Sequence, residues 1–110
     1  MKDCIFCQII TKKAPAKIEY EDKETLAFWN INPKAPIHLL IVPKKHIASL
    51  KELKENDPLM YKLINAVNKT AKKMRVYDLG YQVLINTGKN AGQIIEHLHL
   101  HLMGGWKAEK

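Results

Sequence analysis

Hydrophobic and polar residues alternate with a period of two near the C-terminal end of the chain. Residues 97–102 consist of three histidines and three leucines in strict alternation. Successive side chains of a β-strand point to opposite faces, so a strand would place the leucines on one face and His97, His99 and His101 on the other. A helix would scatter both sets. The pattern predicts a strand from about Ile95 to Gly104, with the imidazoles spaced by about 7 Å.

Two other stretches have the period of a helix. Asp57 is a helix N-cap and Pro58 suits the first helical position, and the apolar residues that follow recur at helical spacing to about Arg75. Near the N-terminus, apolar residues at helical spacing predict a short helix, capped by Asp3 and continuing to about Lys13. The chain therefore has one long and one short predicted helix.

The remaining apolar segments are short and bounded by turn residues. They predict a hairpin formed by residues 17–21 and 25–29, a largely apolar central strand at 37–42, a short helical turn at 47–53 and a strand at 81–87. Residues 32–36 and 88–92 are rich in proline or glycine and predict loops. We expect a single α+β domain over residues 1–110, with an antiparallel sheet of about five strands.

Composition narrows the class of protein further. The chain has 110 residues and a formal net charge of +7. It has neither an apolar run of about 20 residues nor the pattern of a signal peptide, so we expect a cytoplasmic protein with no membrane partner and with reduced cysteines. A basic chain favours phosphate-bearing partners. The lysines are scattered and not interleaved with aromatic residues, so nucleic acid is not the expected partner.

Two clusters carry candidate chemistry. Three histidines on one strand face repel one another when protonated and are desolvated when neutral, so the cluster indicates either a metal site or nucleophilic catalysis at phosphorus. Cys4 and Cys7 are three residues apart and would share one face of a helix. With two imidazoles they would complete a tetrahedral zinc site, and the plainer alternative is two small buried side chains. Redox chemistry has weaker support because no strand precedes the pair.

The chain resembles the histidine triad (HIT) superfamily, whose signature alternates three histidines with apolar residues and ends in two apolar residues. Residues 97–103 fit every position of that signature. Further matches occur in family order along nearly the whole chain: Ile5-Phe6, Ile9-Ile10, Pro15-Ala16-Lys17, Glu21-Asp22, Ala35-Pro36-x-His38, Val42-Pro43-Lys44-Lys45-His46, Asn86, Gly92-Gln93 and Gly104-Gly105. The most similar branch is that of the Hint-like nucleoside phosphoramidases, followed by the dinucleoside polyphosphate hydrolases. The galactose-1-phosphate uridylyltransferase branch has glutamine where this chain has His101.

The resemblance implies a HIT-like fold and a covalent mechanism. His99 would attack the α-phosphorus of a purine nucleotide and form a nucleotidyl-histidine intermediate that water hydrolyses. His101 and His38 would donate hydrogen bonds to the phosphate oxygens. His97 would support the strand, orient the nucleophile or bind metal. The backbone of Gly88–Gly92 would approach the phosphate.

The resemblance also implies binding sites and partners. The nucleoside pocket would be formed by Ile5, Phe6, Ile9, Phe28, Trp29, Asn30 and Ile31, and the phosphate or leaving group would meet Asn86, Gly92, Gln93 and Ile94, with His99 and His101. A structural zinc ion, remote from the bond that breaks, would be held by Cys4, Cys7, His46 and His97, and no catalytic metal would be required. Family members form homodimers through the long helix and an adjoining strand.

Two positions depart from the family pattern. Asn30 stands where the family has an aspartate that binds both ribose hydroxyls, and an amide offers one acceptor oxygen where a carboxylate offers two. Ile94 stands where the phosphoramidase branch has a serine near the leaving group. We expect a hydrolase or transferase that acts on purine nucleoside 5′-phosphoramidates. The alternatives are a dinucleoside polyphosphate hydrolase and a non-catalytic nucleotide- or zinc-binding signalling module.

Overall fold

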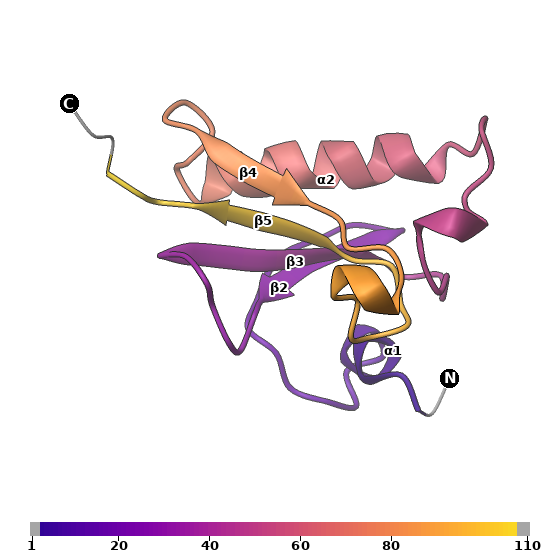
Figure 1. The fold of residues 1–110 in the computed structure, drawn as a ribbon. Coiled ribbons are helices and arrows are strands. Elements are labelled where there is room, and N and C mark those ends of the chain that lie inside the picture. Colours follow the sequence, from indigo (N-terminus) through magenta and orange to yellow (C-terminus); the bar gives the residue numbers. More distant parts are fainter. Residues whose placement is uncertain (1–2, 108–110) are drawn as a thin grey trace.

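A five-stranded antiparallel sheet forms the centre of the molecule, with α2 on one face and α1 on the other (Figure 1). The computed structural model describes residues 3–107. The strand order is β1-β2-β3-β5-β4. The elements are α1 (Ile5–Ile10), β1 (Ile18–Glu21), β2 (Thr25–Trp29), β3 (Ile37–Pro43), α2 (Leu59–Lys73), β4 (Tyr81–Leu84) and β5 (Leu100–Gly104), with single 3₁₀ turns at Leu50–Glu52 and Lys89–Ala91. The predicted α+β class, the five strands and the two helices are confirmed.

The long helix covers one face of the sheet and forms the larger core. Its buried residues pack with the leucines of the C-terminal segment, Leu98, Leu100 and Leu102, which are at most 2% exposed. The carboxylate of Asp57 accepts the backbone N–H of Leu59 at 2.9 Å and so satisfies a free donor of the first turn. The Asp57 side chain therefore caps the helix as predicted, although the N-cap position itself is occupied by Pro58.

The short helix covers the opposite face. Phe6 and Ile9 are buried against residues of β2 and β3. The predicted cap was wrong by one residue, because Cys4, not Asp3, is the N-cap and its sulfur accepts the backbone N–H of Cys7 at 3.3 Å. The helix also ends at Ile10, before the predicted Lys13, since the backbone turns into the left-handed region at Lys12 (φ 65°).

The strand that carries the histidines is shorter than predicted. β5 begins at Leu100, so His97 and His99 lie in the segment before it, and only His101 belongs to the strand. The register pairs Leu100 with Ile41 of β3, and β3 ends two residues later at Pro43, which has no N–H to offer. The preceding segment finds another partner, because Leu98 donates its N–H to the carbonyl of Ile47 at 2.7 Å.

The alternation of faces nevertheless extends through the whole segment. Leu98, Leu100 and Leu102 belong to the core beneath α2, whereas the histidines lie on the α1 face of the sheet. In β3, Ile41 belongs to the α2 face and Leu40 and Val42 to the α1 face, which places His38 on the α1 face as well. Within the described residues, no helix is both long and apolar enough to cross a membrane.

Candidate active site and metal site

Three histidines form a contiguous cluster on the α1 face: His38 of β3, His101 of β5 and His99 from the segment just before β5. The ring centroids of His38 and His101 are 5.2 Å apart, and those of His99 and His101 are 5.1 Å apart. The register of β3 and β5 brings the first pair together, since His38 lies opposite Met103, two residues from His101. Three of the four histidines that the resemblance assigned to catalysis therefore lie together, with His101 in contact with both His38 and His99.

Hydrogen bonds assign the tautomers of His38 and His101. The backbone N–H of Lys34 donates to Nδ1 of His38 at 2.9 Å, so the proton of a neutral His38 lies on Nε2. That Nε2–H donates to Nδ1 of His101 at 2.9 Å, which places the proton of His101 on its own Nε2. The Nε2 atom of His101 is buried and has no hydrogen-bond partner among the described residues. A buried donor without a partner indicates a position for an acceptor.

The tautomer of His99 follows in the same way. Its Nδ1 lies 2.7 Å from the backbone carbonyl oxygen of His97, and a carbonyl oxygen only accepts, so Nδ1 carries the proton. The lone pair of a neutral His99 then lies on Nε2. An imidazole nitrogen with a free lone pair is a nucleophile, and a neighbouring N–H donor can stabilise negative charge that develops beside it. His99 and His101 provide this combination.

Burial keeps the clustered imidazoles neutral. Desolvation lowers the pKa of His99 below its ordinary value of 6.5, although the bond to the His97 carbonyl acts in the opposite direction. Desolvation, with a smaller contribution from the charge of Lys34, lowers the pKa of His38. For His101, desolvation and the neighbouring imidazoles of His99 and His38 lower the pKa to about 4. Near pH 7 the lone pair of His99 is therefore available.

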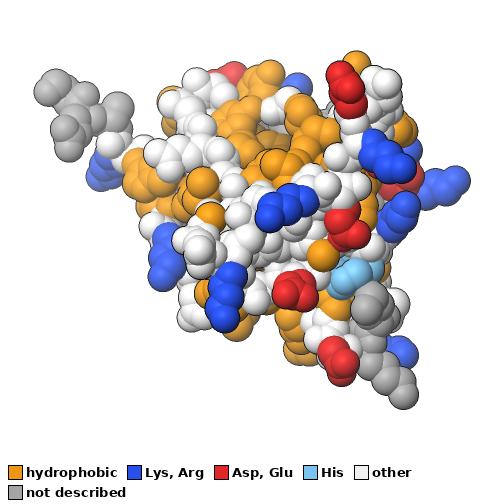
Figure 2. Space-filling view, turned by 45° about the vertical axis from the view of Figure 1, so that its right-hand side comes forward, with side chains coloured by type: hydrophobic (Ala, Val, Ile, Leu, Met, Phe, Trp, Pro, Cys, Tyr) orange, Lys and Arg blue, Asp and Glu red, His pale blue; other side chains and the backbone are white. Residues whose placement is uncertain are grey.

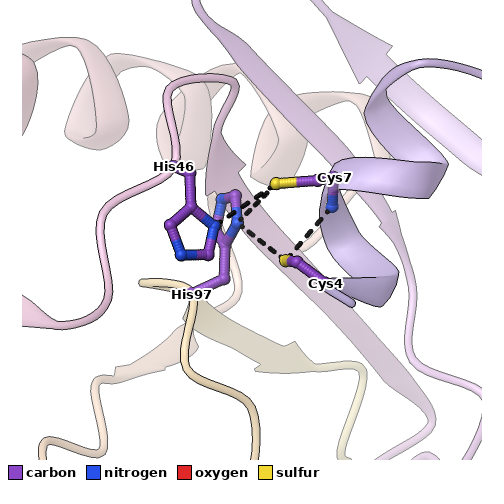
Figure 3. A group of neighbouring side chains, drawn as sticks. All are labelled: Cys4, Cys7, His46 and His97. Carbon is purple, nitrogen blue, oxygen red and sulfur yellow. Dashed lines mark hydrogen bonds between the residues drawn. The ribbon is translucent and has the colours of Figure 1, made fainter. Parts of the chain in front are cut away.

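His97 belongs to a separate cluster with Cys4, Cys7 and His46 (Figure 3). The sulfur of Cys4 lies 3.3 Å from Nδ1 of His97, and the sulfur of Cys7 lies 3.3 Å from Nδ1 of His46 and 3.6 Å from Nδ1 of His97. The four ligand atoms all lie within 4.8 Å of one another, so these residues are close enough to hold a metal ion.

The donor set fits a tetrahedral ion in composition and in spacing. A zinc ion with bonds of about 2.3 Å to sulfur and 2.0 Å to nitrogen separates those ligand atoms by about 3.5 Å. The observed sulfur–nitrogen distances of 3.3–3.6 Å agree with this value. The other ring nitrogen of His97, Nε2, lies 2.8 Å from the carbonyl oxygen of Pro43, to which it donates. That bond leaves Nδ1 as the ligand atom, as in other metal sites with an oriented histidine.

The predicted nucleoside residues divide into buried and exposed groups. Phe6 and Phe28 are buried in edge-to-face contact, with centroids 5.5 Å apart, and the Phe6 ring also lies edge-on to His99 at 5.2 Å. Ile9 is 7% exposed and belongs to the same core. Ile5 and Ile31 are 43% and 90% exposed, so they are not core residues.

Trp29 and Asn30 follow one another at the end of β2 but face different neighbours. Trp29 lies on the opposite face of the strand from Phe28, where its indole N–H donates to Glu19 at 2.7 Å. The oxygen of the Asn30 side chain accepts the N–H of Asn32 at 2.9 Å, which leaves the NH₂ group 3.4 Å from Nε2 of His38. Asn30 therefore lies beside the histidine cluster, whereas the Trp29 side chain does not.

The loop before the histidine segment is held together by Gln93. Its side-chain oxygen accepts the N–H of Gly88 at 2.9 Å, and its NH₂ group donates to the carbonyls of Ala48 at 2.7 Å and Ile95 at 3.0 Å. Gly88 and Gly92 have positive φ angles of 89° and 91°, which only glycine adopts without strain. The Asn86 side chain lies beside Gly92. Ile94 is 91% exposed at the end of this loop.

Two backbone contacts of the site had no signal in the sequence. The N–H of Lys34 orients His38, and the carbonyl of Pro43 orients His97. Neither depends on the identity of the side chain at that position, so a pattern of residue types does not reveal it. The prolines on either side of Lys34 predicted only a loop.

The fold and the cluster define this chain as an α+β protein with a histidine triad. A family model described as "HIT domain" matches residues 11–108, and the chain belongs to the HIT domain family. The chain is 48% identical to Protein HitA of Neisseria gonorrhoeae over 105 residues, which cover 94% of this chain and 97% of HitA.

Solved structures agree with this assignment. A HIT family hydrolase from Clostridium thermocellum is 41% identical, with a TM-score of 0.94 and coverage of 100% of this chain and 96% of the other. A histidine triad nucleotide-binding protein from Candida albicans is 34% identical, with a TM-score of 0.83 and coverage of 98% and 85%.

Proposed function

We propose that this protein is a hydrolase or transferase that cleaves purine nucleoside 5′-phosphoramidates at the α-phosphorus, with His99 as the nucleophile. The observation that carries the proposal is the pairing of two Nε2 atoms. Nε2 of His99 has a free lone pair, because its Nδ1–H is bound to the His97 carbonyl. Nε2–H of the adjacent His101 is a buried donor without a partner among the described residues.

The proposed reaction has two steps. Nε2 of His99 attacks the α-phosphorus, a nitrogen–phosphorus bond forms to the imidazole, and the bond from phosphorus to the amine breaks while the amine gains a proton. Water then attacks the same phosphorus, releases the nucleoside monophosphate and returns the neutral imidazole. In both steps His101 donates its Nε2–H to a phosphate oxygen, where negative charge increases in the transition state.

Relatives support the hydrolase assignment at the level of the family. The proteins from Clostridium thermocellum and Legionella pneumophila are described as HIT family hydrolases, and the Candida albicans protein as nucleotide-binding. The phosphoramidate substrate is inferred from the branch that the sequence resembles. A dinucleoside polyphosphate would meet the same His99 and His101, with a phosphate as the leaving group.

The predicted nucleoside pocket is part of the same proposal. The purine would lie near Phe6 and Phe28, whose buried pair borders His99. Asn30 beside His38 would contact the ribose, and the exposed Ile5, Ile31 and Ile94 would shield the bound nucleotide. Because all polar atoms of the Gln93 side chain hold the loop, its contribution to phosphate binding would include the positioning of backbone N–H groups between Gly88 and Gly92.

The metal proposal assigns a structural zinc ion to Cys4, Cys7, His46 and His97. Such an ion would join α1 to the loop after β3 and to the segment before β5. It would act as a cross-link outside the reaction itself, because the ring of His97 belongs to the cluster while its carbonyl accepts the hydrogen bond from His99. The reaction at phosphorus requires no metal at the catalytic histidines.

The proposed assembly is a homodimer formed through α2 and β4. Tyr61 and Ile64 of α2 are 80% and 51% exposed, and Val83 and Leu84 of the edge strand β4 are each 45% exposed. In the view of Figure 2, hydrophobic side chains gather around a hollow on one side of the molecule. Exposed apolar residues on an edge strand are suited to association. Native mass spectrometry would measure the dimer directly.

The deciding experiment is intact-protein mass spectrometry after rapid quenching without acid. Wild type mixed with adenosine 5′-phosphoramidate should carry a transient adduct of one AMP, and His99→Ala should carry none while still binding AMP by calorimetry. Absence of both adduct and AMP release, with nucleotide binding intact, would favour the non-catalytic module. The same experiment with diadenosine tetraphosphate tests the second hydrolase.

A further inference from the structure

The Cys/His cluster (Cys4, Cys7, His46 and His97) and the proposed nucleophile are linked by two short routes. The first is the backbone of one residue. The ring of His97 is held in the cluster by the sulfurs at 3.3 and 3.6 Å, while its carbonyl oxygen accepts the Nδ1–H of His99 at 2.7 Å. A rotation of the His97 backbone would therefore change the hydrogen bond that fixes the tautomer and direction of the His99 ring.

The second route passes through α1. Phe6 lies between the two cysteines in sequence, is 4% exposed, and its ring contacts both His97 at 5.8 Å and His99 at 5.2 Å. The helix has only six residues, and Cys4 is its N-cap. A helix this short has little stability of its own and depends on tertiary contacts. A change at the sulfurs would therefore move the ring that packs against His99.

The two sulfurs are also placed to react with each other. Cys4 and Cys7 occupy the first turn of α1, and their sulfur atoms lie within the 4.8 Å span of the cluster. Cys7 is only partly buried, so a small oxidant reaches it from solvent. Within the described residues these are the free cysteines, and no other thiol competes for the oxidant.

We propose that the Cys/His cluster is a redox-sensitive clamp on His99, closed when metal joins the four side chains and opened when a peroxide converts Cys4 and Cys7 to a disulfide. In the opening step one hydrogen peroxide takes two electrons from the two thiolates. The sulfur–sulfur bond forms, both metal–sulfur bonds break, and the peroxide leaves as two waters after it takes up two protons. A thiol reductant with added Zn²⁺ reverses the change.

The consequences for the site follow from the two routes. A disulfide removes both sulfurs as partners of His97 Nδ1, so the ring keeps its hydrogen bond to the Pro43 carbonyl and its packing against Phe6 and His46. The His97 ring is then held less firmly, and α1 loses the contact between Cys7 and His46. A displacement of about 1 Å at a reacting group lowers turnover by about 100-fold, so the oxidised protein should be a poor catalyst. This inference rests on His99 being the nucleophile.

The test compares wild type with the Cys4→Ser/Cys7→Ser double variant, before and after stoichiometric hydrogen peroxide and after dithiothreitol with Zn²⁺. Native mass spectrometry reports zinc and the loss of two hydrogens, and far-UV circular dichroism reports folding. The readout independent of activity is the ¹⁵N–¹H spectrum of the histidine rings, which identifies the tautomer and environment of His99.

The proposal expects three coupled changes in wild type. Peroxide should release zinc, shift or broaden the His99 ring signals and lower phosphoramidate turnover by about 10- to 100-fold, all reversibly. The folded double variant should begin with the altered His99 signals and not respond to peroxide. His99 signals and turnover that stay unchanged after zinc release would overturn the clamp, as would equal loss of turnover in the double variant, or a wild type that binds no zinc.

The outcome is separable from that of the proposed function. If neither state of the protein turns over a phosphoramidate, the proposed reaction fails, but the His99 ring signals still show whether the cluster controls that side chain. If turnover occurs and its peroxide response is absent in both proteins, the reaction stands and the clamp fails.

Discussion

The backbone carbonyl of His97 and the Nδ1–H of His99 form a hydrogen bond of 2.7 Å. This bond leaves the lone pair of His99 on Nε2, so the nucleophilic atom is selected by a neighbour two residues away. The tautomer of His101 is fixed from the neighbouring strand, because His38 donates to Nδ1 of His101 and so leaves the His101 proton on Nε2. The site therefore presents one lone pair and one donor side by side before any ligand binds.

Loss of His38 should impair catalysis without loss of nucleotide binding. In His38→Ala, the Nδ1 atom of His101 loses its donor, so His101 can place its proton on Nδ1 and present no N–H to the phosphate. Removal of one donor from a developing oxyanion costs about 100-fold in turnover. Steady-state kinetics should show a lowered kcat and a nearly unchanged KM.

The matched control is His38→Gln, whose amide can donate to His101. It should recover part of the lost turnover. Equal kcat values for the alanine and glutamine variants would show that the tautomer of His101 is not what His38 controls.

Introduction of a hydroxyl at position 94 should raise phosphoramidate turnover. Ile94 is 91% exposed, so Ile94→Ser removes little packing and should leave the melting temperature within about 1 °C. A serine there could donate to the departing amine, for which this chain has no side-chain hydroxyl at that position. The comparison is Leu79→Ser, at a residue that is 89% exposed in the connection between α2 and β4. Equal rates for the two serine variants would remove leaving-group assistance as the explanation.

Gln93 should contribute to stability as well as to activity. Its side chain makes three hydrogen bonds to backbone groups of Gly88, Ala48 and Ile95. Gln93→Ala leaves these groups without that partner and should lower the free energy of unfolding by about 1–3 kcal/mol. Urea denaturation measures this loss. A variant of wild-type stability with reduced kcat would instead indicate that Gln93 acts on the ligand directly.

Removal of metal should lower the melting temperature. An ion that binds only the folded chain stabilises it by about 2.7 kcal/mol when its free concentration is 100 times its dissociation constant. Differential scanning calorimetry with added Zn²⁺ and with a strong chelator measures this difference. His46→Ala removes one proposed ligand and should abolish the zinc dependence. A melting temperature that is independent of zinc in wild type would argue against the metal site.

Acid should destabilise the protein before its carboxylates titrate. Burial lowers the pKa of His101 from 6.5 to about 4, and it lowers the pKa of His38 as well. Between pH 6.5 and about 4, His101 is protonated in the unfolded chain but neutral in the folded chain. The stabilisation that is present above pH 6.5 is therefore lost as the pH falls toward 4.

The measurement is the urea midpoint at pH 7.5, 6.0 and 5.0. Glu19 and Glu21, whose pKa values are lowered by hydrogen bonds from Trp29 and from Lys12 and Lys44, stay ionised across this range. The His101→Gln variant should show a weaker decline. A midpoint that does not change with pH would contradict neutral burial of these rings.

The sequence predicted the faces of the histidine segment but not its secondary structure. Alternation of leucine and histidine reports the face of the sheet on which each side chain lies, and it holds from Leu98 to Leu102, although His99 is buried as well. Strand pairing depends on the backbone groups of a partner, and the ladder between β3 and β5 ends at the Ile41–Leu100 pair, although β3 itself continues to Pro43. The predicted row of equivalent imidazoles became two sites, because His97 turns to the cysteines while His99 and His101 remain together.

The metal ligands were predicted from the family, and the structure places them together over long separations in sequence. Cys4 and His97 are 93 residues apart in sequence, and composition and local spacing do not predict contacts over such a separation.

The side chain of Trp29, in contrast, does not lie with the other residues of the predicted nucleoside pocket. Its position follows Phe28 directly, and a single-residue step along a strand moves its side chain to the other face.

The two faces of the sheet have different functions in β3 and β5: one face packs in the core beneath α2, and the other carries the histidines. Successive residues of each strand therefore alternate between these functions. In β3 and β5, Leu39, Ile41, Leu100 and Leu102 are at most 2% exposed, and Ile41, Leu100 and Leu102 lie in the core beneath α2, whereas His38 and His101 occupy the other face. A deep mutational scan that measures folding and turnover separately should therefore show two kinds of failure at adjacent positions of β5. Substitutions of Leu100 and Leu102 would unfold the protein, whereas substitution of His101 between them would leave a folded but inactive one.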